Sequence, residues 1–426
     1  VSVTTASDAV TFNHSIDGGQ ALTVNSVAGN VTFTGAIGAT TALGGLSVNP
    51  SAGAGTITFT STIGDTSNGA GVIGTTAVGN AATVDIVFSS TDYSFDGATT
   101  FTAKTDADID MAAAVEFTTV ADNISFASGD IELADGANLD IDTGAAGGNI
   151  TIGGSILGVS VETVTLDAGT GTTSVAAIGN STEIGALSIG SAENGGITLN
   201  GAIVTDGAVT IDGPVTLATG AVSVTTANDA ITFNHSIDGG QTLTLVSGTA
   251  ATALQGEIGG TTAITSLTIT NGTAAGTIEV GNIGGTTGAI SIGNTNTATI
   301  TLDGTAYSTG GAQTYTAAAG QNIDITGTAA TFTTTNDNIG FVTAGVDLAN
   351  DGTTTFNTDT AGGTVSFGAA IETDGGDDDL LVVTSGSGNV TFTGAIGVTQ
   401  ELGGLSVNAS AGAGTITFTS TIGDTS

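Results

Sequence analysis

Short segments in which apolar and polar residues alternate recur along the whole chain. The recurring pattern is Gly or Asp, any residue, Val or Ile, Thr or Ser, and then Phe, Ile or Leu. Examples are "DAVTF" (8–12), "GNVTF" (29–33), "GTITF" (55–59), "DNISF" (122–126), "GTVSF" (363–367) and "GTITF" (414–418). Successive side chains of a strand point to opposite faces. In "VTFTGAI" (31–37) we therefore expect Val31, Phe33 and Ile37 inside, and Thr32 and Thr34 outside.

The spacing of the pattern predicts how these strands are stacked. The positions of its Val or Ile mostly differ by 21, 25 or 26 between neighbouring copies, and a difference of 47 occurs twice (150 to 197 and 231 to 278), as 21 plus 26 would give. Strands of three to five residues are not stable as isolated hairpins. A short, regular period is instead typical of a β-solenoid, in which each coil pairs with the next about 4.8 Å away. The predicted coil has about 20–26 residues and contains two or three short strands.

The aromatic residues of the pattern share one slot. They are Phe12, Phe33, Phe59, Phe126, Phe233, Phe341, Phe367, Phe392 and Phe418. We expect these side chains to lie along one internal line of the solenoid. A string of β-sandwich domains is the alternative fold, but it needs longer strands and a core Trp or a Tyr corner, whereas this chain has no Trp and three Tyr. No helical apolar stripe is sustained. The prediction is therefore an all-β protein, one continuous parallel β-helix over residues 1–426.

In addition to the short pattern, two longer segments of the chain are each repeated once. Residues 29–67 and 388–426 are identical at 35 of 39 positions, and residues 1–26 match 222–247 at 21 of 26. Residues 68–426 then form one period of 359 residues, and residues 1–67 resemble the tail of a preceding period. We interpret the chain as a segment of a longer repetitive protein. Because the ends of a solenoid expose unpaired strand edges, we expect end-to-end self-association into filaments, with a coil resembling 68–90 capping Phe418.

Charge narrows the function classes. The chain has 39 acidic residues and a single basic one, Lys104, which gives a net charge of −38. Such a chain offers no cationic surface to phosphates, so a role in nucleic-acid binding is excluded. No uninterrupted apolar stretch approaches the length of roughly 18 residues that a membrane-spanning helix needs, so no membrane insertion is expected. The absence of cysteine excludes a disulfide scaffold or a thiolate metal site.

Several acidic residues are grouped. The groups are Asp106, Asp108 and Asp110; Asp140 and Asp142; and Asp377, Asp378 and Asp379. The i, i+2, i+4 spacing places the first three on one strand face, with Ala107, Ile109 and Met111 inside. Clusters of oxygen ligands suit Ca²⁺, so the first and third groups are the candidate calcium ligands. The alternative is a solvated acidic face that keeps a large β-surface soluble.

Two other residue types have a structural interpretation. His14 and His235 occupy the same repeat position, "FNHSIDGG", which indicates one duplicated residue rather than two selected ligands. Nine Asn-x-Ser/Thr sequences, among them those at Asn30, Asn271 and Asn389, fit turns that lead into strands, although they are also glycosylation acceptors.

The repeat "GNVTFTGAIGATTALGGLSVNPSAGAGTITFTSTIG" (29–64), together with "GGAQTYTAAAGQNIDITG" (310–327), resembles the β-strand repeats of giant bacterial surface proteins, the filamentous-haemagglutinin-like adhesins. The resemblance covers nearly the whole chain. It implies a right-handed parallel β-helix, export to the cell surface, and a role in adhesion, biofilm matrix or surface layers, with surface glycans or other cells as partners. The chain departs from many such adhesins in lacking their basic residues.

The sequence therefore predicts a secreted, non-enzymatic structural protein, either a surface adhesin or a fibre and matrix component. A surface-layer lattice subunit is the second interpretation, since it shares the acidic, Thr- and Gly-rich, cysteine-free composition. A carbohydrate-active β-helix enzyme is the third. A lyase typically needs a basic residue, and only Lys104 is available. A hydrolase needs two carboxylates about 5–9 Å apart in a cleft, and no single pair is distinguished in the sequence.

Overall fold

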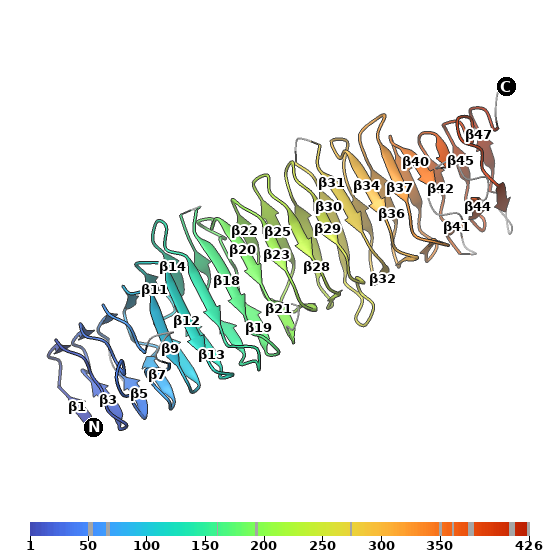
Figure 1. Ribbon diagram of the computed structural model, residues 1–426. Helices are drawn as coiled ribbons and strands as arrows, with labels where there is room; N and C mark the ends of the chain where they lie inside the picture. The colour runs from blue at the N-terminus through green and yellow to red at the C-terminus, as the bar shows by residue number, and fades with distance from the viewer. Residues whose placement is uncertain are drawn as a thin grey trace. The chain divides into compact units, whose positions relative to one another are not determined.

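Short parallel strands make up the structure, a computed structural model that describes residues 1–49, 54–64, 69–159, 161–191, 195–272, 275–348, 352–359, 362–373, 379–408 and 414–423. The chain divides into two compact units, residues 1–214 and 215–426. Every strand pair recorded among the described residues is parallel, and none of these residues is helical. Each unit is a stack of coils, that is, a β-solenoid, and Figure 1 shows the strands of each unit lying side by side.

In the first unit the strands lie on three sheets, which form three walls; the strands up to residue 88 alternate between the first two sheets, and the third sheet begins at residue 92. The first wall contains β1 (Ser2–Thr4), β3 (Ala21–Asn25), β5 (Gly45–Val48), β7 (Thr76–Gly79), β10 (Thr99–Thr102), β13 (Ile124–Ser128), β16 (Ile150–Ile152), β19 (Thr172–Val175) and β21 (Gly196–Leu199). The second contains β2 (Val10–Phe12), β4 (Val31–Phe33), β6 (Ile57–Phe59), β8 (Ile86–Phe88), β11 (Asp108–Met111), β14 (Asp130–Leu133) and β17 (Ile156–Leu157), with β22 (Ile203–Thr205) joined to it through single bridges. The third contains β9 (Asp92–Phe95), β12 (Val115–Thr119), β15 (Leu139–Asp142), β18 (Thr163–Asp167), β20 (Ala186–Ile189) and β23 (Val209–Ile211).

The second unit has the same three-walled plan. One wall contains β24 (Val215–Leu217), β27 (Ile237–Asp238), β32 (Ile283–Thr286), β35 (Ala306–Thr309), β38 (Thr331–Thr334), β41 (Thr353–Asn357), β44 (Leu380–Thr384) and β46 (Gly404–Asn408). The next contains β25 (Val222–Thr226), β28 (Thr242–Val246), β30 (Ser266–Thr270), β33 (Ile290–Ile292), β36 (Gln313–Thr316), β39 (Ile339–Val342), β42 (Val365–Phe367), β45 (Val390–Phe392) and β47 (Ile416–Phe418). The last contains β26 (Ile231–Phe233), β29 (Thr252–Leu254), β31 (Thr277–Val280), β34 (Thr299–Leu302), β37 (Asn322–Ile325), β40 (Gly345–Leu348) and β43 (Ile371–Thr373).

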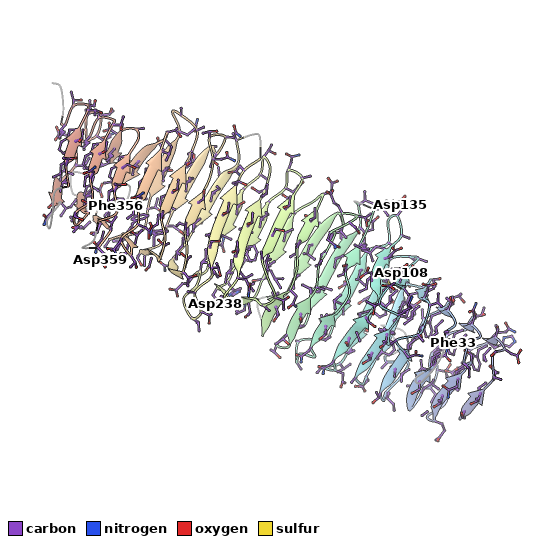
Figure 2. The ribbon with its side chains drawn as sticks, turned by 180° about the vertical axis from the view of Figure 1, so that it is seen from behind. Phe33, Asp108, Asp135, Asp238, Phe356 and Asp359 are labelled. Carbon is purple, nitrogen blue, oxygen red and sulfur yellow. The ribbon has the colours of Figure 1, made fainter. Side chains whose placement is uncertain are left out.

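The predicted alternation of inward and outward side chains is confirmed. Val31, Phe33 and Ile37 are buried, while Thr32 and Thr34 keep contact with solvent. Of the residues labelled in Figure 2, Phe33 packs in the core, and Asp135 lies exposed in a turn between strands. The parallel pairing also excludes the alternative of β-sandwich domains, whose sheets are antiparallel.

The predicted coil length is confirmed for most coils. In the second wall of the first unit, Val10 pairs with Val31 and Val31 with Ile57, so the residue number advances by 21 in one coil and by 26 in the next. The following coil, from Ile57 to Ile86, advances it by 29 and is longer than predicted. Extra residues lie between Ile63 and Val72, which are nine positions apart, whereas their partners Ile37 and Leu43 are six positions apart.

The two intervals of 47 residues between copies of the motif, 150 to 197 and 231 to 278, each contain one further coil, as predicted. Ile231 pairs with Thr252, which pairs with Ile278, so this difference of 47 is 21 plus 26. Ile150 pairs with Thr173, which pairs with Ile197, so the other is 23 plus 24. The intermediate coils escaped the motif because a buried Thr replaces Val or Ile in the inward slot.

The expectation of a single line of Phe side chains is wrong. Phe12, Phe33 and Phe59 stack on one wall, with Phe88 as an unforeseen fourth member, but Phe126 lies on another wall of the same unit. In the second unit, a separate stack is formed by Phe341, Phe367, Phe392 and Phe418, while Phe233 lies on a different wall. The motif specifies an inward position, and all three walls offer equivalent inward positions, so it does not specify the wall.

Candidate metal centre and the acidic walls

The candidate metal centre lies on two adjacent strands of the first unit, β11 and β14. These strands pair in register, so that Asp108 lies beside Asp130 and Asp110 beside Glu132. The alternating residues Ile109 and Met111 point into the core and are fully buried. Since neighbours in a strand face opposite ways, the carboxylates between them are placed on the outer surface. The hydrophobic inner face therefore orients the acidic outer face.

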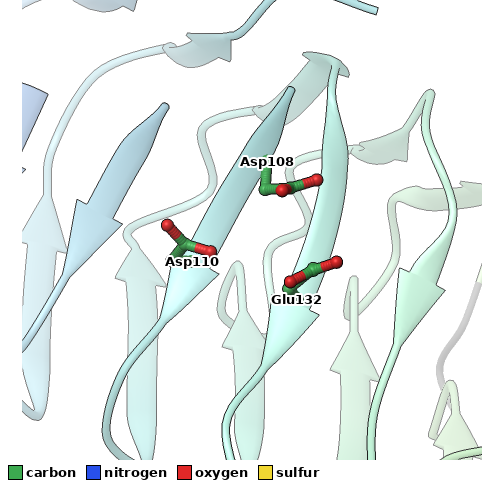
Figure 3. Close-up of side chains that lie close together, drawn as sticks. All are labelled: Asp108, Asp110 and Glu132. Carbon is green, nitrogen blue, oxygen red and sulfur yellow. The ribbon is translucent and has the colours of Figure 1, made fainter. Parts of the chain in front are cut away.

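Three of these carboxylates converge. Asp108, Asp110 and Glu132 each offer an oxygen, and the three oxygens lie within 4.8 Å of one another (Figure 3). Asp108 and Asp110 are half-buried, and Glu132 is exposed. An all-oxygen set of this kind suits a hard divalent cation such as Ca²⁺, which takes six to eight oxygen ligands and would complete its shell with water. Exposed acidic groups also occur commonly without an ion.

The electrostatics of this group oppose ionisation. Burial, followed by the negative charges of Asp85 and Asp108, raises the pKa of Asp110 to about 6. Burial and the charges of Asp85 and Asp130 also raise the pKa of Asp108. Burial raises the pKa of Glu132 as well, with a further contribution from Asp108. Like charges in register on neighbouring strands repel each other, so either a proton or a cation relieves the repulsion.

The six aspartates predicted as calcium ligands do not come together at one site in the structure. Asp108 and Asp110 are brought together as expected. Asp106 lies in the turn before β11, where its carboxylate is 3.5 Å from the Lys104 ammonium. Asp379 belongs to the second unit, is buried, and accepts a hydrogen bond from the Gly352 amide at 3.2 Å. Asp377 and Asp378 lie outside the described residues.

Glu132 was missed at the sequence level. It occurs in "DIELADG" (130–136), and its position exceeds that of Asp110 by 22. One coil of the predicted length separates the two residues, so a search for acidic residues one coil apart would have found the pair. The i, i+2 spacing identifies acidic neighbours only within one strand, whereas this cluster is formed across two strands.

A second acidic row lies on the third wall of the first unit. Asp92 pairs with Glu116, which pairs with Asp140, along β9, β12 and β15. Burial raises the pKa of Glu116, and the charges of Asp140 and Asp92 add to this effect. Among the described residues, this row does not bring three carboxylates as close together as Asp108, Asp110 and Glu132.

Other acidic residues have a structural role as acceptors for backbone amides. One oxygen of Asp17 accepts from the amides of Thr40 and Thr41 at 2.7 and 3.0 Å. These bonds lower the pKa of Asp17. Asp238 accepts from Thr261 and Thr262 in the same way, at 2.8 and 2.9 Å. Such carboxylates hold one coil on the next.

Buried Glu162 is a further case. Burial opposes its ionisation, but the amides of Val159, Gly136 and Val161 donate to its carboxylate and lower its pKa overall. Hydrogen bonds to the charged form are the usual reason for a depressed carboxyl pKa. Part of the acidic composition therefore serves the stacking of coils rather than a ligand.

The positions of the two histidines and of the Asn-x-Ser/Thr sequences agree with a structural role. His14 is exposed and His235 half-buried, and neither belongs to a metal-binding group among the described residues. The side-chain carbonyls of Asn30 and Asn389 accept the amides of Thr56 and Thr415 from the next coil at 3.0 and 2.9 Å.

Asn271 is different from the exposed sequon residues. It is fully buried, and its amide nitrogen donates to Ser247 Oγ and to the Ala250 carbonyl, both at 3.1 Å. The nitrogen that would carry a glycan is thus committed to the core, so the folded chain does not present Asn271 as a glycosylation acceptor.

The fold and its surface define the class: a parallel β-solenoid with acidic walls. No protein-family model matches the chain, and no curated protein and no solved structure was found to match it. The resemblance to filamentous-haemagglutinin-like adhesins therefore remains an expectation drawn from the repeat motif. In the described part of the chain, no helix is long and apolar enough to span a membrane.

Proposed function

We propose that this chain is a non-enzymatic structural β-solenoid that acts outside the cell, at the surface or in a matrix, and that associates end to end into filaments. The observation that carries the proposal is the surface of the last described coil. Its strand β47 pairs with β45 on one edge, and no described strand pairs with the other edge. Its apolar residues Ile416, Phe418 and Ile422 are exposed. An unpaired edge beside an apolar face favours addition of another coil, supplied by continuation of the chain or by a second copy.

Charge supports growth along the stack rather than sideways. A net charge of −38 with one basic residue keeps neighbouring solenoids apart at low salt. Divalent cations would weaken this repulsion by binding between carboxylates. We propose calcium as the cation that Asp108, Asp110 and Glu132 would hold, since all three ligands are oxygens.

Electron microscopy of the purified chain over a range of concentrations tests the proposal. Unbranched filaments that lengthen with concentration, and that form bundles when millimolar calcium is added, are the expected result. A two-dimensional lattice would favour the surface-layer interpretation instead. Particles that stay monomeric at every concentration and calcium level would contradict the proposal. A parallel assay for cleavage of polysaccharides addresses the enzyme alternative.

A further inference from the structure

One wall of the first unit differs from the other two in charge. Among the described residues, the strands of the first wall, from β1 to β21, contain no charged side chain. The strands of the other two walls carry carboxylates, namely Asp108, Asp110, Asp130 and Glu132 on the second wall and Asp92, Glu116, Asp140, Asp142 and Asp167 on the third. In a chain with a net charge of −38, the first wall is therefore an uncharged face.

The outward side chains of the first wall form a row of hydroxyl groups. Each coil places one residue in the row, and parallel pairing aligns it with a residue of the next coil, about 4.8 Å away. The row consists of Ser2, Thr23, Ser47, Ala77, Thr100, Ser125, Thr151, Ser174 and Thr198. All of them are exposed or half-buried, and all except Ala77 carry a hydroxyl. The wall therefore presents a regular, polar but uncharged surface.

Exposed apolar side chains border the first wall on both edges. Val27 and Val84 lie in connections that lead from this wall to the second, after β3 and β7, and they are 44% and 46% exposed. Ile73 and Val120 lie in connections that lead into the wall, before β7 and β13, and they are 54% and 70% exposed. A partner that covers the wall and its edges would therefore also remove apolar surface from water.

We propose that the first wall of the first unit is an interaction surface through which two copies of the chain pair side by side, wall against wall. The same patch then serves both copies, as in a dimer with two-fold symmetry. Hydroxyl groups suit this arrangement, because each one can both donate and accept a hydrogen bond. Ionised carboxylates only accept hydrogen bonds and repel each other, so the acidic walls do not complement themselves in this way.

Charge and spacing favour a second copy as the partner. Two copies that meet through their first walls keep the carboxylate rows of the other walls apart. Both copies repeat their hydroxyl groups at the same interval, so the two rows match along the whole wall. The acidic walls stay on the outside of the pair and still repel neighbouring pairs at low salt. This pairing does not depend on the proposed end-to-end association and is compatible with it.

The size of the wall meets the requirement of a specific interface. Its strands of three to five residues cover a face of roughly 40 Å by 13 Å, given about 4.8 Å between strands and about 3.3 Å per residue. Pairing would bury on the order of 1,000 Å² in total, which is the lower limit for a specific interface. The bordering side chains of Val27, Ile73, Val84 and Val120 extend this area.

Sedimentation equilibrium of charge variants tests the inference. The dimer dissociation constant is measured with a chelator present, so that divalent cations do not bridge carboxylates. Thr100→Asp combined with Thr151→Asp places charges in the row, and the partner copy duplicates them. We expect the dissociation constant to rise at least about a hundredfold, because like charges then meet across the interface. Thr32→Asp combined with Ser188→Asp is the matched control, since it adds the same charges to the other two walls and should leave the dissociation constant nearly unchanged.

Cross-linking identifies the paired face without added charge, and it decides the matter if circular dichroism shows that the aspartates disturb folding. The chain has no cysteine, so Ser125→Cys introduces a unique thiol in the middle of the row. Ser188→Cys introduces one on the third wall and serves as the control. A short bifunctional maleimide should cross-link the Ser125→Cys chain into dimers and leave the Ser188→Cys chain monomeric.

The outcomes separate this pairing from other forms of association. A dimer that the row variant weakens and the control does not, and that cross-links through Ser125→Cys, supports the inference. A parent chain that stays monomeric at every concentration, a dimer equally stable in the row variant, or cross-linking only through Ser188→Cys would overturn it. A monomeric parent that binds a neutral polysaccharide through this wall would also overturn it. The variants leave the two end coils unchanged, so filament assembly and side-by-side pairing can fail independently.

Discussion

Residues 29–64 and 388–423 have nearly the same sequence in two different surroundings. Within each copy the stacking is alike: the rings of Phe33 and Phe59 lie 5.0 Å apart at 4°, and those of Phe392 and Phe418 lie 4.9 Å apart at 4°. Burial differs, since Phe59 is fully buried and Phe418 is 41% exposed. A coil therefore obtains its conformation from its own sequence and from the preceding coil, whereas its burial depends on the next coil. This is the nearest-neighbour behaviour of a repeat protein.

The largest expected effect separates the two copies directly. Replacing Phe59 with Ala should lower the free energy of unfolding by about 3–5 kcal/mol, because it leaves a cavity between stacked coils. Phe418→Ala should lower it by less than about 1 kcal/mol, since its ring is partly exposed and lies in the last described coil. Urea unfolding followed by circular dichroism measures both.

The outward-facing pair Thr58→Ala and Thr417→Ala provides the control for these two variants, because neither side chain packs in the core. Equal losses for Phe59→Ala and Phe418→Ala would show that burial by the next coil does not determine the energetic difference.

The next effect concerns the buried hydroxyl of Thr76, which lies in the coil that follows residues 29–64. Thr76 is fully buried, and its hydroxyl has no hydrogen-bond partner among the described residues. A buried hydroxyl without a partner costs about 1–3 kcal/mol. Thr76→Val keeps nearly the same shape and removes this penalty, so we expect stabilisation of about 1–2 kcal/mol in urea unfolding. Thr58→Val, on the solvent side, should change the free energy of unfolding little. A Thr76→Val chain less stable than the parent would show that the Thr76 hydroxyl does have a hydrogen-bond partner.

A third effect concerns the repulsion that the carboxylates of Asp85 and Asp108 exert on the carboxylate of Asp110. The folded pKa of Asp110, about 6, lies above its ordinary value of 3.8, so the folded state binds more protons between these values. Stability should therefore rise as pH falls from 7 through 6 towards 4. At pH 7, Asp110→Asn should stabilise the chain by on the order of 1 kcal/mol, a figure reduced for solvent screening.

Thermal unfolding as a function of pH and calcium measures this effect. Asp110→Asn should flatten the pH profile between 4 and 6, and millimolar calcium should raise the Tm of the parent more than that of the variant. Asp106→Asn is the matched control, because Asp106 lies in the turn beside Lys104 and outside the cluster. If the pH profile of Asp110→Asn equals that of the parent, Asp110 is not the group whose raised pKa makes stability depend on pH.

The sequence predicted the fold well because a solenoid repeats one simple rule. Alternation and a regular spacing suffice to specify strands, their inward residues and their parallel stacking, as Val31 and Phe33 show. It did not predict the wall on which each Phe lies, since the three walls use the same pattern. Of the candidate site, Asp108 and Asp110 were found because they share a strand. Glu132 was not, because its proximity depends on the register between coils.

The smallest effect tests a contact that both copies keep despite a change in sequence. Asp17 accepts the amides of Thr40 and Thr41 in the first copy, and Glu372 accepts the matching amides of Thr399 and Gln400, both at 3.0 Å, in the second. The contact survives the change from Thr41 to Gln400 because the donor is the backbone amide of that residue and not its side chain.

Charge on Asp17 should make this contact depend on pH. The Thr40 and Thr41 amides lower the pKa of Asp17 below 3.8. Its stabilisation is therefore present above pH 4 and is lost as pH falls through the lower, folded pKa. The side chain is exposed, so we expect less than about 1 kcal/mol. Asp17→Asn keeps an acceptor oxygen and should remove the pH dependence, whereas Asp17→Ala should lose the contact at every pH. Hydrogen exchange of the Thr40 and Thr41 amides between pH 2 and 5 measures the difference, and identical profiles for the parent and Asp17→Asn would show that the carboxylate charge plays no part.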